Sequence, residues 1–360
     1  MSEYRIAGIL KLTSPLHVAS PGDRVIDPNS LIPSYGKGGL PLSGTTRYPL
    51  ALSEEEIVSE EWENPNHRGI VYLPVFPAND LRGRLRRRAA EEVFKVLSLR
   101  GELLTLETYH GMMCGAVTGQ PSKELTFDLA LKSGRHSFLG LFGGGPRLVR
   151  SCLQIHTLWP VTHTTIKAGL VSSYYEDQKF LGRSDRLTRA IFYGRIDDAL
   201  VFSDGRAELI VKEYSTAVAD WMNELGSGER SKRQLHTFAA IEYVIPGTRF
   251  YSEMKVETER AGLGALGLLI RSVTAFANKQ GIGGWTRNGF GRFESQFDLL
   301  TPDDVRVALL IKAGDEYEPN INSDEVAEAL DAWTVASSTI DAAELEELYS
   351  LPAEKRKAVG

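Results

Sequence analysis

Two strand–helix–strand patterns, one near each end of the first 300 residues, most constrain the fold of this 360-residue chain. In the first pattern the predicted strands and helix occupy residues 4–13, 69–75, 81–99 and 148–158. In the second, a strand at Arg249–Glu257 is followed by a helix at 262–279 and a strand at 291–299. Two such units in one chain predict an α+β fold with a ferredoxin-like (RRM-like) palm.

The segments outside these units are less regular, and we interpret them as insertions and an extension. Residues 20–70 are rich in Pro, Gly, Ser and Asn, and residues 162–236 contain basic loops around one predicted helix at 213–225. Residues 301–360 carry 14 acidic and 5 basic residues, a net charge of −9, whereas residues 1–300 have a net charge of +3. The predicted organisation is therefore one domain over 1–300 and an acidic helical extension over 301–360, with helices near 323–333 and 341–349.

Composition excludes several classes of protein. No apolar run is long enough to cross a bilayer, and the first residues lack a signal-peptide pattern. Two cysteines, Cys114 and Cys152, give no disulfide framework. We therefore expect a cytoplasmic protein without a membrane partner.

An arginine-rich helix start is the sharpest local feature. Five of the seven residues from Arg82 to Arg88 are arginines, at the predicted start of the helix over 81–99. A helix N-terminus with a row of guanidinium groups suits phosphates. The alternative is a solvated helix face paired with Glu91 and Glu92, although two glutamates cannot neutralise five arginines.

Glycine is concentrated in two further segments. Residues 140–147 include the run Gly143-Gly144-Gly145, where backbone amides can approach a ligand closely. Residues 281–293 combine glycine with Arg287, Arg292 and three aromatic side chains. This combination is typical of single-stranded nucleic-acid recognition by stacking and phosphate contact, although each segment alone is compatible with a simple tight turn.

Three patterns indicate other chemistry. Residues 262–267 match the dinucleotide-binding pattern Gly-x-Gly-x-x-Gly, but no acidic residue follows at the expected distance. Asp27 lies in the long early loop, where a metal-dependent RNA-cleaving residue could lie, and its Asp-Pro context also fits a turn. Four residues have zinc-compatible spacing: His110, Cys114, Cys152 and His156.

Five segments, in this order, resemble the repeat-associated (RAMP) superfamily of CRISPR proteins. They are the opening strand at 6–18, the Pro-x-x-x-Leu-Arg-Gly helix start at 73–83, Leu-Phe-Gly at 140–143, Pro-Gly-Thr-x-Phe at 245–250 and the glycine-rich stretch at 283–292. Length and insertions make the chain most similar to the backbone subunit, the seventh Cas protein family, in its type IV version. Asp80 departs from the small residues usual before this Leu-Arg-Gly, and we expect it to cap the helix.

The resemblance implies a non-catalytic subunit without a cofactor or metal. Copies would stack head to tail on a guide CRISPR RNA and present it to target DNA. The other implied partners are a cap subunit, a guide-processing subunit, a large subunit and a helicase. A thumb would carry Lys167, Lys179, Arg183, Arg186 and Arg189. The remaining implied RNA-binding residues are His17, Arg82, Arg84, Arg86, Arg87, Gly143, Gly144, Gly145, Arg147, Trp285, Arg287, Asn288 and Arg292.

Two alternatives belong to other functional classes. Some type III backbone subunits cut target RNA with a loop aspartate, for which Asp27 is the candidate here. The second alternative is a dinucleotide enzyme built on residues 262–267.

Overall fold

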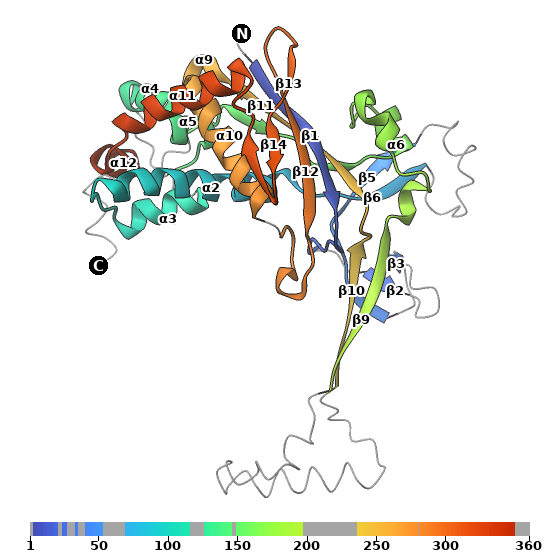
Figure 1. Ribbon diagram of the computed structural model, residues 1–360. Helices are drawn as coiled ribbons and strands as arrows, with labels where there is room; N and C mark the ends of the chain where they lie inside the picture. The colour runs from blue at the N-terminus through green and yellow to red at the C-terminus, as the bar shows by residue number, and fades with distance from the viewer. Residues whose placement is uncertain are drawn as a thin grey trace, which may run out of the picture. The chain divides into compact units, whose positions relative to one another are not determined.

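The structure is a computed structural model, shown in Figure 1. It describes residues 3–20, 24–26, 33–34, 40–52, 69–115, 126–145, 149–196, 236–279 and 281–349. The chain forms two compact units. The larger contains 1–19, 46–187 and 244–360, and the smaller contains 20–45 and 188–243.

An antiparallel sheet organises the larger unit. Its strand order is β13-β12-β1-β11-β7, and β8 also pairs with β11. The strands are β1 (Glu3–Leu12), β7 (Leu153–Ile155), β8 (Trp159–Pro160), β11 (Arg249–Glu257), β12 (Phe293–Leu300) and β13 (Arg306–Ala308). The order β12-β1-β11-β7, with every neighbouring pair antiparallel, is that of a ferredoxin-like sheet. The predicted α+β fold class is confirmed.

Two long helices supply the crossovers and cover one face of this sheet (Figure 1). They are α2 (Ala78–Leu99) and α10 (Leu263–Asn278), which pack against each other. Alternation along β1 sends Ile6 and Leu10 into the core beneath these helices, and it sends Ala7 and Ile9 to the opposite face. Because both faces are covered, β1 is apolar over most of its length.

The opposite face is covered by a segment of little regular structure. It contains α6 (His163–Lys167) and the 3₁₀ helices η2 (Ser173–Gln178) and η3 (Ser184–Arg186). Val161, Val171 and Tyr175 pack there against Ala7 and Ile9 of β1. This part of the sheet is therefore not open to solvent.

The acidic extension packs on the same core as the palm. Its helices are α11 (Asp324–Thr339) and α12 (Ala342–Tyr349), close to the predicted positions. A Cβ on Gly267 of α10 would lie 2.0 Å from the carbonyl oxygen of Ala329 in α11. A Cβ on Gly264 would lie 2.9 Å from the Cβ of Ala336. Two glycines of the dinucleotide-like pattern thus allow close helix packing, which accounts for them without a nucleotide.

Shorter elements complete the larger unit. The helices are α3 (Leu106–Cys114), α4 (Phe127–Arg135), α5 (Ser137–Phe142), α9 (Thr258–Ala261) and η5 (Thr286–Asn288). Two hairpin pairs are β5 (Arg47–Ala51) with β6 (Ile70–Pro74), and β14 (Leu310–Ala313) with β15 (Glu316–Pro319). No helix in the described residues is long and apolar enough to cross a membrane.

The smaller unit is a five-stranded sheet of order β3-β2-β4-β10-β9. Its strands are β2 (Arg24–Ile26), β3 (Pro33–Ser34), β4 (Leu40–Ser43), β9 (Thr188–Ile196) and β10 (His236–Val244). A fully buried ion pair, 2.9 Å between Arg24 Nη1 and Glu242 Oε2, joins β2 to β10. The same carboxylate accepts a hydrogen bond from the backbone N–H of Thr45.

Three local predictions need comment. The strand predicted over 148–158 is restricted to Leu153–Ile155. The N-cap of α2 is Pro77, so the prediction that Asp80 caps this helix is wrong. Asp80 instead pairs with Arg84 one turn later, at 3.2 Å. The helix predicted over 213–225 lies outside the described residues.

Candidate nucleic-acid interface

The arginines of α2 mostly bind other parts of the protein. Arg86 is only 6% exposed, and it donates to the carbonyl oxygens of Gly143 (3.1 Å) and Phe142 (2.8 Å). Burial lowers the pKa of its guanidinium. Arg82 donates to Ser151 Oγ at 3.1 Å and to the carbonyl oxygen of Leu153 at 2.8 Å. Both side chains thus tie α2 to the chain between the end of α5 and the start of β7.

Arg84, Arg87 and Arg88 differ in exposure and in partners. Arg84 reaches the glycine-rich residues 281–293, donating to the carbonyl oxygens of Gly281 (2.9 Å) and Gly283 (3.4 Å). Arg88 pairs with Glu91 at 2.6 Å. Arg87 is exposed. Of the five arginines, Arg87 is therefore the one whose placement best suits an RNA partner.

The loop Gly143-Gly144-Gly145 is closed by the protein itself. Its three amides donate to the carbonyl oxygens of Leu139 (2.7 Å), Val149 (2.8 Å) and Gly115 (3.1 Å), in that order. The ring of Tyr349 lies over Gly145, 3.7 Å from the position of a Cβ. These amides are therefore already satisfied and do not face a ligand, contrary to the sequence-based interpretation of this loop. Arg147 lies outside the described residues.

The glycine-rich turn, residues 281–291, is anchored to the chain that follows β1. The Gly291 amide donates to the carbonyl oxygen of Pro15, and the Gly284 amide donates to that of His17, both at 2.7 Å. Gly291 has φ 76°, and a Cβ there would lie 1.9 Å from the carbonyl oxygen of Ile282. His17 itself is buried, so it supports the turn and has little surface for RNA.

This anchored turn presents exposed side chains suited to a single strand. Trp285 is 38% exposed and has the left-handed value φ 61°, which is rare for a bulky residue. Thr286, Arg287 and Asn288 form the 3₁₀ turn η5 and are exposed, as is Arg292. An aromatic ring for stacking thus lies close in sequence to two guanidinium groups for phosphate contact.

The residues assigned to the thumb fall into both units. Four of them, Lys167, Lys179, Arg183 and Arg186, lie in the segment that covers the sheet of the larger unit. Lys179 pairs with Glu176 at 3.0 Å, and Arg183 pairs with Asp185 at 2.7 Å. Arg189 lies on β9 of the smaller unit, where it donates to the carbonyl oxygen of Thr188 at 2.8 Å. The two strands β9 and β10 flank residues 197–235, which lie outside the described residues.

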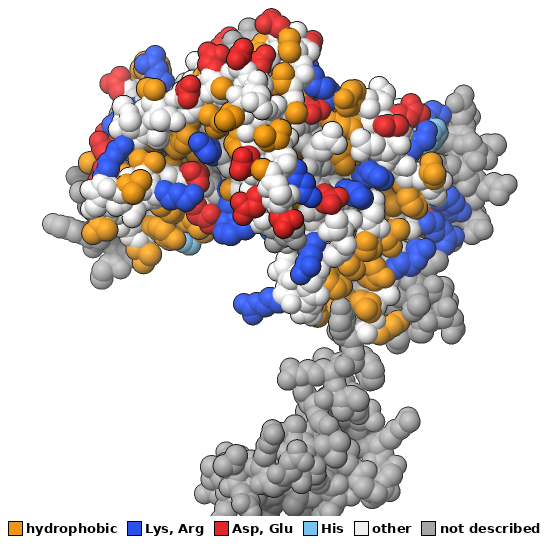
Figure 2. Space-filling view, in the orientation of Figure 1, with side chains coloured by type: hydrophobic (Ala, Val, Ile, Leu, Met, Phe, Trp, Pro, Cys, Tyr) orange, Lys and Arg blue, Asp and Glu red, His pale blue; other side chains and the backbone are white. Residues whose placement is uncertain are grey.

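The sheet face that RRM domains use for base stacking is not available over its centre. Tyr251 of β11 faces this side, but it packs against Tyr175, with ring centroids 5.5 Å apart. Two charged residues on the same side are paired, Lys11 with Glu294 and Lys255 with Glu253. On the other face of the sheet, Figure 2 shows basic and acidic side chains interspersed over α2 rather than a continuous basic stripe. RNA contact at the glycine-rich turn therefore fits the structure better than contact across the sheet.

The predicted metal ligands do not come together as a set of four. Cys114 Sγ lies 3.7 Å from His110 Nδ1, whereas Cys152 is buried and its pKa is raised to about 11 by burial. Within the described residues, no three His, Cys, Asp or Glu side chains are grouped so that they could hold a metal ion. Asp27 lies outside the described residues, so its assignment stays a prediction.

Comparisons with known proteins find similar solved structures. No family model matches the chain, and no curated protein matches its sequence. Among solved structures, the fold is similar to a chain described as "Type IV-B CRISPR Complex". The identity is 14%, the TM-score is 0.43, and the match covers 86% of this chain and 96% of that one.

Proposed function

We propose that this chain is a guide-RNA-binding backbone subunit of a CRISPR interference complex. In this proposal it performs no catalysis, and its copies assemble head to tail along the guide, which pairs with target DNA. A heterologous contact of this kind produces an open helix rather than a closed ring. The cap, guide-processing, large-subunit and helicase partners implied by the sequence resemblance belong to the same proposal.

The observation that carries the proposal is that the five resembling segments contact one another although they are far apart in sequence. The glycine-rich turn bonds to Pro15 and His17 after β1, and Arg84 after the Leu-Arg-Gly segment bonds to the same turn. Arg86 bonds to the Leu-Phe-Gly segment. The Pro-Gly-Thr segment bonds to the end of β1 through Gly247 N–H and Leu12 carbonyl oxygen, at 2.7 Å. The resemblance therefore describes one connected substructure.

Within that substructure, the exposed side chains fit a polyphosphate single strand. Arg287 and Arg292 would neutralise phosphates, and Trp285 would stack on a base. Such contacts carry little sequence information, as expected for a subunit that leaves recognition to base pairing.

A charge-reversal experiment tests this interface. The amount of RNA that co-purifies with the full chain is expected to fall at least about tenfold in the double variant Arg287→Glu/Arg292→Glu, because two phosphate contacts become repulsive. The matched control is Arg271→Glu, which reverses one exposed arginine on α10. RNA length and amount are measured after extraction, together with thermal unfolding of each variant. Equal RNA retention in the double variant and in the control would reject the interface.

The same preparation separates the alternatives. A ladder of bound RNA lengths is expected for a filament subunit. Cleavage of a target RNA that Asp27→Ala abolishes would instead favour the type III nuclease. A preparation free of nucleic acid that binds a nicotinamide cofactor would reject both RNA proposals.

A further inference from the structure

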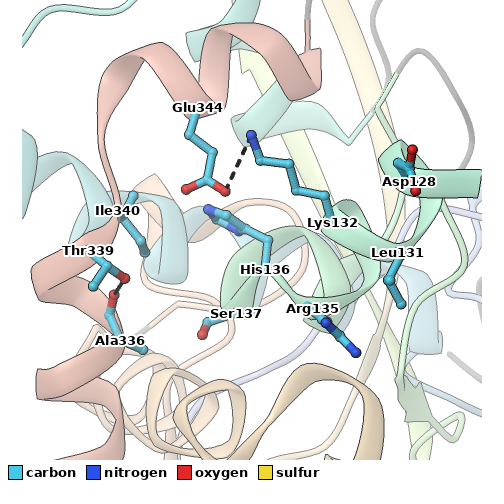
Figure 3. Close-up of a pocket in the computed structure, with 10 residues that line it drawn as sticks. All are labelled: Asp128, Leu131, Lys132, Arg135, His136, Ser137, Ala336, Thr339, Ile340 and Glu344. Atoms are coloured by element: carbon cyan, nitrogen blue, oxygen red, sulfur yellow. Dashed lines mark hydrogen bonds and ion pairs between the residues drawn. The ribbon is translucent and has the colours of Figure 1, made fainter. Parts of the chain in front are cut away.

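A crevice on the larger unit contains a buried hydrogen-bond donor that the proposed RNA interface does not use. It lies between α4–α5 and α11–α12, with a volume of about 480 Å³ (Figure 3). This volume is within the range of binding pockets for small ligands. His136 lies in its wall, at the junction of α4 and α5.

The proton position of His136 follows from its hydrogen bonds. Its Nδ1 accepts from the backbone N–H groups of Phe138 and Leu139, both at 3.2 Å, so Nδ1 carries no proton. Burial lowers the pKa of His136 to about 4, and the imidazole is therefore neutral at neutral pH with its proton on Nε2. Nε2 is buried and has no hydrogen-bond partner in the structure. A buried donor of this kind is normally paired with an acceptor from the protein, from an ordered water or from a ligand.

An acceptor lies beside this donor. Figure 3 shows the ring of His136 pointing toward the carboxylate of Glu344, and no hydrogen bond joins them. Lys132 Nζ is 3.9 Å from Glu344 Oε1, but its short contact, 2.5 Å, is to Glu347. The Glu344 carboxylate therefore keeps capacity to accept a further hydrogen bond.

We propose that this crevice binds an amide group of a peptide segment from a protein partner. The amide carbonyl would accept from His136 Nε2–H, and the amide N–H would donate to Glu344. A carboxylate ligand fits less well because it would be repelled by Glu344 and offers no donor. The charged lining residues balance, Asp128 and Glu344 against Lys132 and Arg135, as expected for a neutral ligand group.

Two observations favour a peptide over a nucleobase, which could offer the same hydrogen bonds. Residues 324–349 of α11 and α12 carry eight acidic and no basic residues, which would repel a phosphate backbone. Phe127 on α4 and Val335 on α11 are 80% and 69% exposed, so the helices that border the crevice also offer apolar surface to peptide side chains.

The test follows the His136 Nε2–H signal by NMR in the full-length protein during titration with four probes. Acetamide represents an Asn or Gln side chain, and N-methylacetamide represents a peptide backbone. Acetate and uridine represent an anion and a nucleobase. A saturable shift is expected with at least one amide, with a Kd on the order of 10 mM for so small a ligand. Acetate and uridine are expected to bind at least about tenfold more weakly.

Two variants act as controls, with the backbone amides of Thr339 and Ile340 as a second reporter. His136→Asn keeps a side-chain acceptor at the N-cap of α5 but removes the donor, so amide binding should be lost. Glu344→Met should weaken it at least about fivefold. The proposal is overturned if no amide gives a saturable shift, which would leave only water in the crevice. It is also overturned if acetate or uridine binds as well as the amides, or if Glu344→Met alone shifts the signal as loss of an internal hydrogen bond would.

Discussion

The loop 143–145 and the turn 281–291 share a composition of glycine and nearby arginine, yet the two regions use it in opposite ways. At 143–145 the amides bond inside the protein, and Arg86 comes from α2 to bond two carbonyl oxygens. At 281–291 the backbone is also bonded inward, but Trp285, Arg287 and Asn288 are exposed. In both regions, glycine near arginine marks a backbone that is hydrogen-bonded within the protein. Only exposed side chains such as those of the turn 281–291 are in a position to contact a ligand.

Replacing Arg86 should give the largest loss of stability. It tests whether the loop 143–145 is held by hydrogen bonds inside the protein. Arg86→Met leaves two buried carbonyl oxygens without a donor, so the free energy of unfolding should fall by about 3 kcal/mol. Arg87→Met is the matched control on the same helix, and it should change stability by less than about 0.5 kcal/mol because Arg87 is exposed. Urea unfolding measures both. Similar small losses in the two variants would mean that Arg86 does not hold the 142–143 carbonyls.

Arg82 and Arg86 are among the residues that the resemblance implies contact RNA. If they did so, charge reversal at these positions would abolish guide binding and leave the fold intact. Because both side chains bond within the protein, reversal should instead destabilise the larger unit. Loss of RNA in such variants would then report unfolding rather than a missing phosphate contact.

In the turn 281–291, two glycines distinguish the cost of a steric clash from the cost of a positive φ alone. A Cβ at Gly291 would meet the carbonyl oxygen of Ile282 at 1.9 Å, whereas at Gly289 nothing lies within 4 Å, although both have positive φ. Gly291→Ala should therefore cost about 3 kcal/mol and Gly289→Ala about 1 kcal/mol. The difference between their urea midpoints is the measurement. Equal costs would indicate that the turn is loosely held.

Acid should destabilise the loop 143–145 more than the turn 281–291. Since the pKa of His136 in the folded protein is about 4, below its ordinary value of 6.5, the unfolded chain binds a proton that the folded chain does not. Stability is thus full above about pH 6.5 and is lost as pH falls toward 4, by about 2 kcal/mol at pH 5. Hydrogen exchange should show α5 and the 143–145 loop opening first while the 281–291 turn stays protected. His136→Asn should remove this part of the pH dependence.

The sequence predicted the fold better than the site. Strand Arg249–Glu257 and helices α10 and α11 follow directly from periodicity, because buried strands and amphipathic helices have strong patterns. The direction of Arg82 and Arg86 could not be predicted, since their acceptors are carbonyl oxygens about 56 to 71 residues away that no composition rule identifies. The number of nearby glutamates does not show whether the arginines have hydrogen-bond partners, because most of their acceptors are carbonyl oxygens. His136 was missed because a single histidine between two helices has no sequence signal.

The smallest expected effect concerns Trp285. It tests whether the exposed side chains of the turn 281–291 contact RNA. Trp285→Gly relieves a left-handed conformation that costs a bulky residue about 1 kcal/mol, so stability should be unchanged or slightly raised. RNA affinity should fall about tenfold, because one stacked base is worth about 1–3 kcal/mol. Thermal unfolding and fluorescence anisotropy with a labelled single-stranded RNA, at one fixed salt concentration, give the two values. Trp285→Phe is the control that keeps a ring and should retain most of the affinity. A variant that loses stability and affinity together would indicate that Trp285 supports the turn rather than contacting RNA.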